Sequence, residues 1–400
     1  MAIPMVLPSR SRIPPPARAA AEIRAHLEGL LGIPFADGNE ITALRNGREI
    51  FPAMLAEIER AQQTVELVTF IYWTGRIAQR MAETLARKAG EGVQVRVVLD
   101  AFGAAPMSKH LLEQMTGAGV QIRWFRPLKS WKAWKATHRT HRKVLVVDGA
   151  VGFTGGVGIA QEWEGDARDP SEWRDTHFRV RGPAVLGLRA AFFGNWAETD
   201  RSATRALLDA QPLPEVGPAA VQVVRSTACF GWSDIATVLD SLISLAGHRV
   251  RIATAYFAPD ESWRDLLTSA VDRGIEVEIL IPGPHIDKRI SELAGADQIG
   301  DLLEAGVRFF RFQPTMLHTK ILLVDDDLVA VGSANFNQRS ILKDDEIALV
   351  VIDAGLAATL HRHFEEDLAR SEAMTPEQFR SRGPLRRLRE LVARPVRSNV

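Results

Sequence analysis

Cysteine is almost absent from this sequence. Its 400 residues include a single one, Cys229, so no disulfide can form within the chain, which suits a reducing compartment. Long apolar runs are lacking too, because no stretch reaches the roughly 18 uninterrupted apolar residues of a membrane-spanning helix. The first ten residues are too short and too interrupted by proline for a signal peptide. We therefore expect any lipid substrate to be reached from the membrane surface.

Net charge is also absent. The 49 basic residues are matched by 49 acidic ones, which argues against a protein that coats nucleic acid with its whole surface. Metal-ligand clusters are missing as well, because His138, His361 and His363 have no cysteine or carboxylate cluster beside them. We expect structural or surface roles for these histidines, and neither a metal ion nor another cofactor.

What the chain does contain is an internal repeat. The stretches His141–Asp148 and His318–Asp325 both read His-x-Lys, four residues, Asp. Six residues further on, each copy has a small pair, Gly155-Gly156 in the first and Gly332-Ser333 in the second. At about one in twenty per position, two such sets arise by chance with a probability of about 0.003. The repeat is therefore a property of the fold, and length together with the repeat predicts two domains.

Strand periodicity separates the roles within each copy. Residues two apart on a strand share a face, so each histidine should project beside its lysine. Asp148 and Asp325 fall about 23 Å along the strand from their histidines, so we predict that they form the hairpin turns and anchor strands. Two-residue turns would place His141 opposite Gly156 and His318 opposite Ser333. Small residues there would leave room for a phosphate.

The elements around the two motifs repeat as well. Apolar periodicity predicts helix, strand, helix, strand over 49–100 and again over 234–281, which implies parallel strands with crossover helices. The chain has only two tyrosines, Tyr72 and Tyr256, and they fall at matching points. A proline-rich connector marks the boundary. The predicted segments are a flexible basic, proline-containing stretch with a helix (1–37), a first domain (38–210), a linker (211–220), a second domain (221–371) and a basic amphipathic tail (372–400).

Two His-Lys pairs in one cleft suit phosphodiester chemistry. Pseudo-twofold packing of the repeats would bring His141 and His318 face to face. One imidazole can attack phosphorus, while the other protonates the leaving oxygen and then deprotonates the acceptor. Lys143 and Lys320 would stabilise the charge of the transition state, and Asn335 fits a hydrogen-bond donor to the phosphate.

The paired H-x-K-x4-D motifs, with G-S-x-N after the second, resemble those of the phospholipase D superfamily. From about Gly38 onward the sequence is similar to bacterial cardiolipin synthases. The resemblance implies an α/β fold of two pseudo-twofold-related phospholipase D-like domains, each a mixed, mostly parallel sheet flanked by helices, with one active site at their interface. It also implies an enzyme that joins two phosphatidylglycerol molecules into cardiolipin and glycerol through a phosphohistidine intermediate.

The resemblance further implies roles for single residues. His141 would be the nucleophile and His318 the acid-base group, with the reverse order left open, and Glu346 would orient a histidine. Two positions depart from the family pattern. Gly158 stands where the second motif has its asparagine, which makes the half-sites unequal, and Asp344 stands where cardiolipin synthases often have asparagine, which leaves the choice of lipid open.

A basic, tryptophan-rich segment precedes the first motif. From Arg123 to Lys143 it contains eight arginines or lysines and no acid. Such a segment can attract anionic lipid or nucleic acid, and tryptophan suits either the bilayer interface or base stacking; an ordinary solvated loop is the third interpretation. The predicted rim residues are Trp124, Lys129, Trp131, Lys132, Trp134 and Lys135.

An amphipathic pattern near the C-terminus favours the membrane. Leu385, Leu388 and Leu391 share a helical face bordered by arginines, although packing on the protein body would explain them equally well. We predict a peripheral enzyme on the cytoplasmic face of the cell membrane, with anionic phospholipid, chiefly phosphatidylglycerol, as its partner and no nucleic acid. Phosphodiester hydrolysis and, less strongly, nuclease activity are the alternatives, and the oligomeric state is open.

Overall fold

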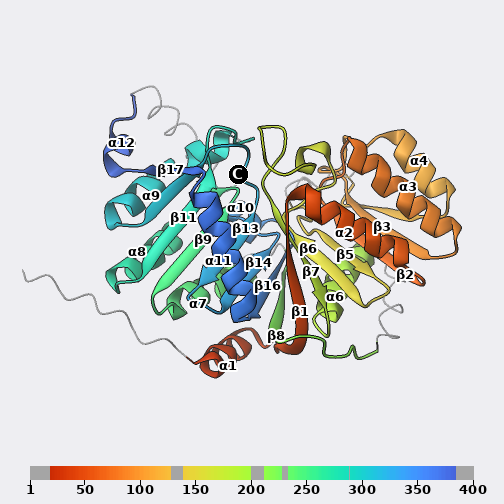
Figure 1. Ribbon diagram of the computed structural model, residues 1–400, viewed down its shortest axis with the longest axis horizontal. Coiled ribbons are helices and arrows are strands. Elements are labelled where there is room, and N and C mark those ends of the chain that lie inside the picture. The colour runs from red at the N-terminus through yellow and green to blue at the C-terminus, as the bar shows by residue number, and fades with distance from the viewer. Residues whose placement is uncertain (1–18, 128–137, 200–210, 228–232, 288, 384–400) are drawn as a thin grey trace, which may run out of the picture.

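The computed structural model describes residues 19–127, 138–199, 211–227, 233–287 and 289–383. One 15-stranded sheet runs through both halves of the chain, in the order β17-β12-β11-β9-β13-β14-β16-β8-β1-β7-β6-β5-β2-β3-β4. Helices cover this sheet on both faces (Figure 1). The two halves meet where β8 pairs antiparallel with β1.

The first half follows an N-terminal helix, α1 (Ala20–Leu31). Its elements are β1 (Ala36–Arg45), α2 (Asn46–Arg60), β2 (Thr64–Thr69), α3 (Arg76–Gly90), β3 (Gln94–Asp100), α4 (Lys109–Gly117), β4 (Gln121–Phe125), β5 (Val144–Val147), β6 (Val151–Gly155), the 3-10 helix η1 (Gln161–Trp163), β7 (Thr176–Arg181) and α6 (Val185–Thr199).

The second half repeats this order with small additions. Its elements are β8 (Ala219–Ser226), α7 (Asp234–Leu245), β9 (Arg249–Thr254), β10 (Phe257–Ala258), α8 (Glu261–Asp272), β11 (Glu276–Pro282), α9 (Arg289–Ala305), β12 (Arg308–Phe312), β13 (Lys320–Val324), β14 (Leu328–Gly332), β15 (Phe336–Asn337), α10 (Gln338–Leu342), β16 (Glu346–Ile352), α11 (Ala354–Leu368), β17 (Ser371–Met374) and α12 (Pro376–Arg380).

Apolar periodicity decides which face of each helix is buried. In α3, Ile77, Met81 and Leu85 recur every four residues and are all buried in the core of the first half. In α8 the helix begins where the Asp260 side chain accepts a hydrogen bond from the backbone N–H of Trp263, and Leu267 lies in the core. On the other face of the sheet, α6 and α11 pack over strands from both halves and share one core. The molecule is therefore joined by a continuous apolar layer as well as by the sheet.

The prediction of a mixed α/β fold is confirmed, but the sheet is not mostly parallel. Parallel pairing is confined to the outer strands of each half, β2 with β3 and β3 with β4, and their counterparts β9 with β11 and β11 with β12. The middle strands are antiparallel because each motif forms a hairpin and a further strand, β7 or β16, returns beside it. Sequence patterning identified the crossover strands and missed the returning ones.

Three predicted segment boundaries fall inside strands. β1 begins at Ala36, before the predicted start of the first domain, and β8 begins at Ala219, inside the predicted linker. β17 extends past residue 371 to pair with β12. The helix predicted near the N-terminus is α1, and its Ile23 and Leu27 are buried in the core of the second half. Among the described helices, none has the length and apolar character needed to cross a membrane.

The motif hairpins have three-residue turns rather than the predicted two-residue turns. Val147 pairs with Val151, and Val324 pairs with Leu328. Each turn begins with an aspartate in the left-handed region, at φ 49° for Asp148 and 51° for Asp325, which aspartate tolerates better than most residues. The register therefore shifts by one. The predicted pairing of the histidines with Gly156 and Ser333 is wrong, and these residues lie beyond the ends of the ladders.

Candidate active site

The two motif histidines line one pocket between the halves. Its volume is about 290 Å³, and His141, Lys143 and His318 all contribute to its lining. Phe70 packs edge-on against the His141 ring with the ring centroids 5.3 Å apart. Lys320 lies beside His318, with its Nζ 3.1 Å from Nδ1 and 3.2 Å from Nε2. The fold thus brings together residues that lie far apart in the sequence.

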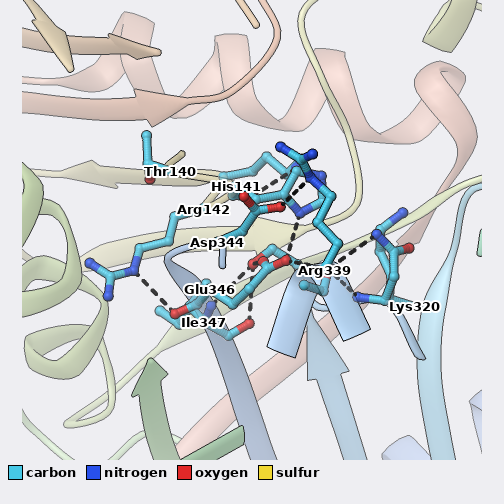
Figure 2. Close-up of polar contacts among 12 residues, drawn as sticks. Thr140, His141, Arg142, Lys320, Arg339, Asp344, Glu346 and Ile347 are labelled. Carbon is cyan, nitrogen blue, oxygen red and sulfur yellow. Dashed lines mark hydrogen bonds and ion pairs between the residues drawn. The ribbon is translucent and has the colours of Figure 1, made fainter. Parts of the chain in front are cut away.

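His141 is held by a carboxylate of the second half. Its Nδ1 lies 2.8 Å from Oε1 of Glu346, the first residue of β16 (Figure 2). Glu346 is fully buried and accepts hydrogen bonds from the Ser333 and Ser340 hydroxyls. Burial raises the pKa of Glu346 above its ordinary value, although the nearby Lys143 ammonium opposes this shift.

His318 is held in the same way by a carboxylate of the first half. Its Nδ1 lies 2.8 Å from Oδ2 of Asp175, directly before β7. Asp175 also accepts hydrogen bonds from Trp163 Nε1 at 2.9 Å and from the backbone N–H of Thr176 at 2.8 Å. Burial alone would raise the pKa of Asp175, but the contact with His318 and the charge of Lys320 hold it below its ordinary value.

The carboxylates are therefore exchanged between the halves. Backbone bridges accompany both exchanges, between Thr140 and Asp345 on one side and between Arg174 and Leu317 on the other. Buried arginines reinforce the arrangement: Arg142 donates from Nε to the Glu346 carbonyl at 3.1 Å (Figure 2), and Arg174 bonds Asp367. Each histidine is positioned only when the two halves are docked.

Both lysines are buried beside their histidines. Lys143 Nζ donates to the His141 carbonyl at 2.8 Å, and Lys320 Nζ donates to the His318 carbonyl. Burial lowers the pKa of the Lys143 ammonium, with the Glu346 carboxylate opposing the shift. Burial also lowers the pKa of His318 to about 4, and the neighbouring Lys320 adds to this. In the ligand-free protein His318 is therefore neutral near pH 7.

The second motif's asparagine lies inside this network. Asn335 is buried, and its backbone N–H donates to Ser340 Oγ at 3.1 Å, whereas no partner is found for its Oδ1 among the described residues. The matching Gly158 has no room for a side chain, because a Cβ there would lie 2.8 Å from Ile71 Cβ and 3.1 Å from the Trp163 ring. This packing explains why the first motif departs from the second.

The other departure, Asp344, lies beside the His141 half-site. Its Oδ2 accepts a hydrogen bond from Arg339 Nε at 3.2 Å, and Oδ1 is buried without a partner among the described residues (Figure 2). Burial raises the pKa of Asp344 to about 7. An aspartate that is partly protonated near neutral pH can donate a hydrogen bond, as the amide of asparagine does.

Asp148 and Asp325 lie away from the pocket, where they anchor strands. Asp148 accepts backbone N–H groups from residues 62–64 at 2.8 to 2.9 Å, and Asp325 accepts those of residues 247–249 at 2.7 to 3.0 Å. The small pairs lie closer to the site. Gly332 and Ser333 adjoin β16, and Gly155 and Gly156 adjoin β7.

Two site residues, Asp175 and Trp163, were missed by sequence reasoning. The first half has a longer segment between its hairpin and its carboxylate, so spacing alone did not identify Asp175. The register supplies the signal, because His177 pairs with Gly155 as Ala348 pairs with Gly332. The carboxylate lies two residues before His177 in the first half and two residues before Ala348 in the second. Trp163 likewise stands as far after Gly155 as Ser340 stands after Gly332.

The matching of the two tyrosines is wrong by one residue. Tyr72 forms a bridge with Ile159, and the corresponding bridge of the second half joins Phe257 to Phe336. Tyr72 therefore corresponds to Phe257. Tyr256 corresponds instead to Ile71, since the hydroxyls of Thr69 and Thr254 bond the carbonyls of these two residues.

Most of the predicted rim lies outside the described residues. Trp124 is in β4, half-buried against the core of the first half, and it does not line the pocket. Five rim residues lie outside the described part of the chain: Lys129, Trp131, Lys132, Trp134 and Lys135. The same is true of Cys229 and of the apolar face predicted near the C-terminus. His361 has a structural place, bonded to the Asp325 carbonyl. No cluster of three metal-ligating side chains is found among the described residues.

Known proteins resemble this chain in sequence. The family model described as "Cardiolipin synthase, PLD-like domain" matches residues 54–162 and 239–368, one segment in each half. The chain is 32% identical over 363 residues to "Probable cardiolipin synthase YwiE" of Bacillus subtilis, covering 89% of this chain and 71% of that one. It is 35% identical over 365 residues to "Cardiolipin synthase A" of Pseudomonas aeruginosa, covering 91% and 73%.

A solved structure supports the fold independently. The phosphatidylserine synthase of Haemophilus influenzae superposes with a TM-score of 0.71 at 14% identity, covering 95% of this chain and 100% of that one. The family model and the relatives of 30% identity or more show an enzyme of the phospholipase D type, with its two histidine motifs in one pocket. Within that class, the chain belongs to the cardiolipin synthase, PLD-like domain family.

Proposed function

We propose that this enzyme transfers a phosphatidyl group from one phosphatidylglycerol molecule to another, giving cardiolipin and glycerol. One observation carries the proposal: His141 and His318 line a single pocket, and each is held at Nδ1 by a buried carboxylate from the opposite half. The names of the relatives support cardiolipin as the product. The anionic phospholipid is thus the proposed substrate and partner.

The first step forms a covalent intermediate. Nε2 of His141 attacks phosphorus, the bond from phosphorus to the glycerol oxygen breaks, and His318 gives that oxygen a proton. His318 is neutral in the ligand-free protein because burial and Lys320 lower its pKa. A phosphodiester anion bound between Lys143 and Lys320 offsets their charge, which allows His318 to take up the proton that it delivers.

The second step reverses the first with a new alcohol. A hydroxyl of the second phosphatidylglycerol attacks phosphorus, the bond from phosphorus to His141 Nε2 breaks, and the hydroxyl proton passes to His318. Glu346 and Asp175 accept the Nδ1 protons, which directs Nε2 toward the reaction in both rings. Lys143, Lys320 and the Asn335 amide stabilise the charge on the phosphate oxygens.

The proposed site of action is the membrane surface, on its cytoplasmic face. Phe102 lines the pocket and is 58% exposed, which suits contact with the apolar part of a lipid. The predicted basic segment runs from Arg123 to Lys143 and includes His141. Basic residues there would favour anionic lipid.

Purified protein incubated with phosphatidylglycerol vesicles tests the proposal. We expect cardiolipin as the main lipid product and phosphatidic acid as the minor one, with glycerol released in an amount equal to the two together. Phosphatidic acid without cardiolipin would make the enzyme a hydrolase. Cleavage of single-stranded oligonucleotides with no lipid product would make it a nuclease and overturn the proposal.

A further inference from the structure

The pocket lining is chemically divided between the two halves. Apart from the motif residues, the first half contributes the apolar and aromatic side chains Phe70, Ile71, Trp73, Phe102, Pro106 and Trp173. The second half contributes Tyr256 and Asp287. A repeat with pseudo-twofold symmetry would give the pocket two similar walls, so this division is a specific departure.

Two corresponding positions create the division. After β3 the chain continues A-F-G-A-A-P-M over 101–107, and after the matching strand β11 it continues G-P-H-I-D over 283–287. The first loop is apolar and supplies Phe102, and the second supplies Asp287. At the other position, Ile71 of the first half is replaced by Tyr256 in the second.

Tyr256 and Asp287 form a fixed pair beside His318. The Tyr256 hydroxyl donates to Asp287, with Oδ1 at 2.8 Å and Oδ2 at 2.9 Å. The tyrosine ring is only 8% exposed and lies edge-on to the His318 ring at 6.4 Å. Burial, together with the Asp287 carboxylate, raises the pKa of Tyr256 well above its ordinary value, so the phenol keeps its proton. Asp287 itself is exposed, and its remaining lone pairs can accept further hydrogen bonds.

The charges of the pocket select the kind of ligand that Asp287 can accept. A carboxylate can bind either hydroxyl groups or an ammonium group. Lys143 lines the same pocket and Lys320 lies beside His318, so a cationic headgroup would meet two like charges. A neutral polyol meets no such repulsion.

We infer that Asp287, held by Tyr256, binds the hydroxyl groups of the alcohol that leaves or enters at phosphorus, while the apolar wall of the first half receives the glyceride end of the lipid. The inference rests on the proposed phosphatidyl transfer and specifies its alcohol as a polyol such as glycerol. One hydroxyl group of the polyol donates a hydrogen bond to Asp287, and the neighbouring hydroxyl group lies beside His318. The oxygen of this second hydroxyl attacks phosphorus, the bond between phosphorus and His141 breaks, and the hydroxyl proton goes to His318. Water has no second hydroxyl for Asp287, so transfer is favoured over hydrolysis.

The experiment compares Asp287→Ala and Tyr256→Phe with the wild type on phosphatidylglycerol vesicles. The readout is the ratio of cardiolipin to phosphatidic acid, together with exchange of the headgroup for free glycerol or free ethanolamine. We expect Asp287→Ala to lower the ratio about tenfold, the loss of one hydrogen bond to a charged group, mainly through a higher KM for the alcohol. Tyr256→Phe should lower it about threefold, because the carboxylate stays but loses its orientation.

Tyr72→Phe is the matched control. It also removes a tyrosine hydroxyl, but one that donates to the Ala78 carbonyl in the core at 2.8 Å, so the product ratio should stay at the wild-type value. An unchanged ratio in Asp287→Ala overturns the inference, as does a greater loss of transfer to ethanolamine than to glycerol.

The proposed function and this inference fail in different ways. A wild-type protein that makes no cardiolipin but exchanges its headgroup for free glycerol loses the proposed product, and the inference is then judged from exchange alone. A wild-type protein that makes cardiolipin with a ratio insensitive to Asp287 loses only the inference. If the wild type transfers the phosphatidyl group neither to phosphatidylglycerol nor to free glycerol, both the proposed function and the inference are wrong.

Discussion

The two half-sites reach the same geometry with different residues. Each histidine lies 2.8 Å from a buried carboxylate oxygen, yet one carboxylate is Glu346 and the other is Asp175. Glu346 is held by two serine hydroxyls, whereas Asp175 is held by the Trp163 indole and a backbone N–H. The repeat has kept the position of a carboxylate oxygen while the groups that support it have diverged.

The length of the carboxylate explains part of this difference. Aspartate is one methylene shorter than glutamate, so the hairpin beside it comes closer. A Cβ at Gly156 would lie 2.3 Å from Asp175 Oδ1, while Ser333, at the same place in the second half, has room for its hydroxyl to reach Glu346. The two halves therefore use the same frame with complementary side-chain sizes.

The largest effect is expected from removing the histidine that each half contributes to the pocket. His141→Ala and His318→Ala should each lower kcat by on the order of 10⁴-fold or more, because nucleophile and proton donor act as a unit. Cardiolipin formation by proteins with wild-type circular dichroism measures this. His248→Gln, which changes a half-exposed histidine away from the pocket, should keep full activity. A folded His318→Ala protein with near-normal turnover would disprove the two-histidine site.

Changing the two carboxylates tests whether the half-sites are equivalent. Asp175→Asn and Glu346→Gln keep the side-chain shape but remove the charge that orients an imidazole, and we expect each to lower kcat about 10²- to 10⁴-fold. The kcat should fall more than the KM rises, since neither residue lines the pocket. Wild-type kcat in either variant would show that its contact is structural only.

The loss of stability at low pH should differ between the two halves, because at one position beside the site only the first half has a buried histidine, His177. Burial lowers the pKa of both His318 and His177 to about 4, whereas the unfolded value is about 6.5. The unfolded chain therefore binds protons that the folded state rejects, so stability is intact above about pH 6.5 and falls as the pH drops toward 4. The upper limit is about 1.4 kcal/mol per pH unit for each histidine.

The second half has alanine at the position that His177 occupies in the first half, so alanine is the substitution to test at His177. His177→Ala should flatten the decrease in stability between pH 6.5 and 4, as measured by urea unfolding at several pH values. His110→Ala, which changes an exposed histidine of α4, is the comparison variant. An unchanged slope in His177→Ala would mean that this residue does not contribute to the acid sensitivity.

Exchanging the small residues tests the argument about side-chain size. Gly156→Ser should cost about 1 to 3 kcal/mol of stability, because the added Cβ meets Asp175 in a packed site. Ser333→Gly makes the opposite change, removes one hydrogen bond to Glu346, and should cost about 1 kcal/mol. Thermal unfolding compares them. A Gly156→Ser protein as stable as the wild type would contradict the size argument.

The smallest effect on activity is expected where the halves agree most closely. Asp148→Asn and Asp325→Asn weaken the contacts with the backbone N–H groups of the neighbouring turns, and each should cost about 1 to 2 kcal/mol. Activity per folded molecule should stay near the wild-type value, because both residues lie outside the pocket. Urea midpoints and kcat together decide the matter; a lowered kcat at an unchanged midpoint would point to a direct catalytic role.

The sequence predicted the repeat, the crossover strands and the motif residues, because apolar periodicity and motif spacing are local properties. It missed the features that depend on strand register and on contacts between residues far apart in the sequence. The left-handed Asp148 lengthens the turn and shifts the pairing by one residue. Asp175 reaches His318 only after the whole chain has folded, so no nearby pattern indicates it. The tyrosines were matched by position after a strand, although the pairing of Tyr72 with Ile159 and of Phe257 with Phe336 shows that Tyr72 corresponds to Phe257.

The exchange of carboxylates has a consequence for the order of synthesis. Glu346 follows His141 by 205 positions, whereas Asp175 precedes His318 by 143. A chain emerging from the ribosome therefore carries His141 long before the residue that orients it exists, while Asp175 is already present in the chain when His318 is made. Since the first half folds first during translation, the nascent enzyme stays inert until the second half has docked.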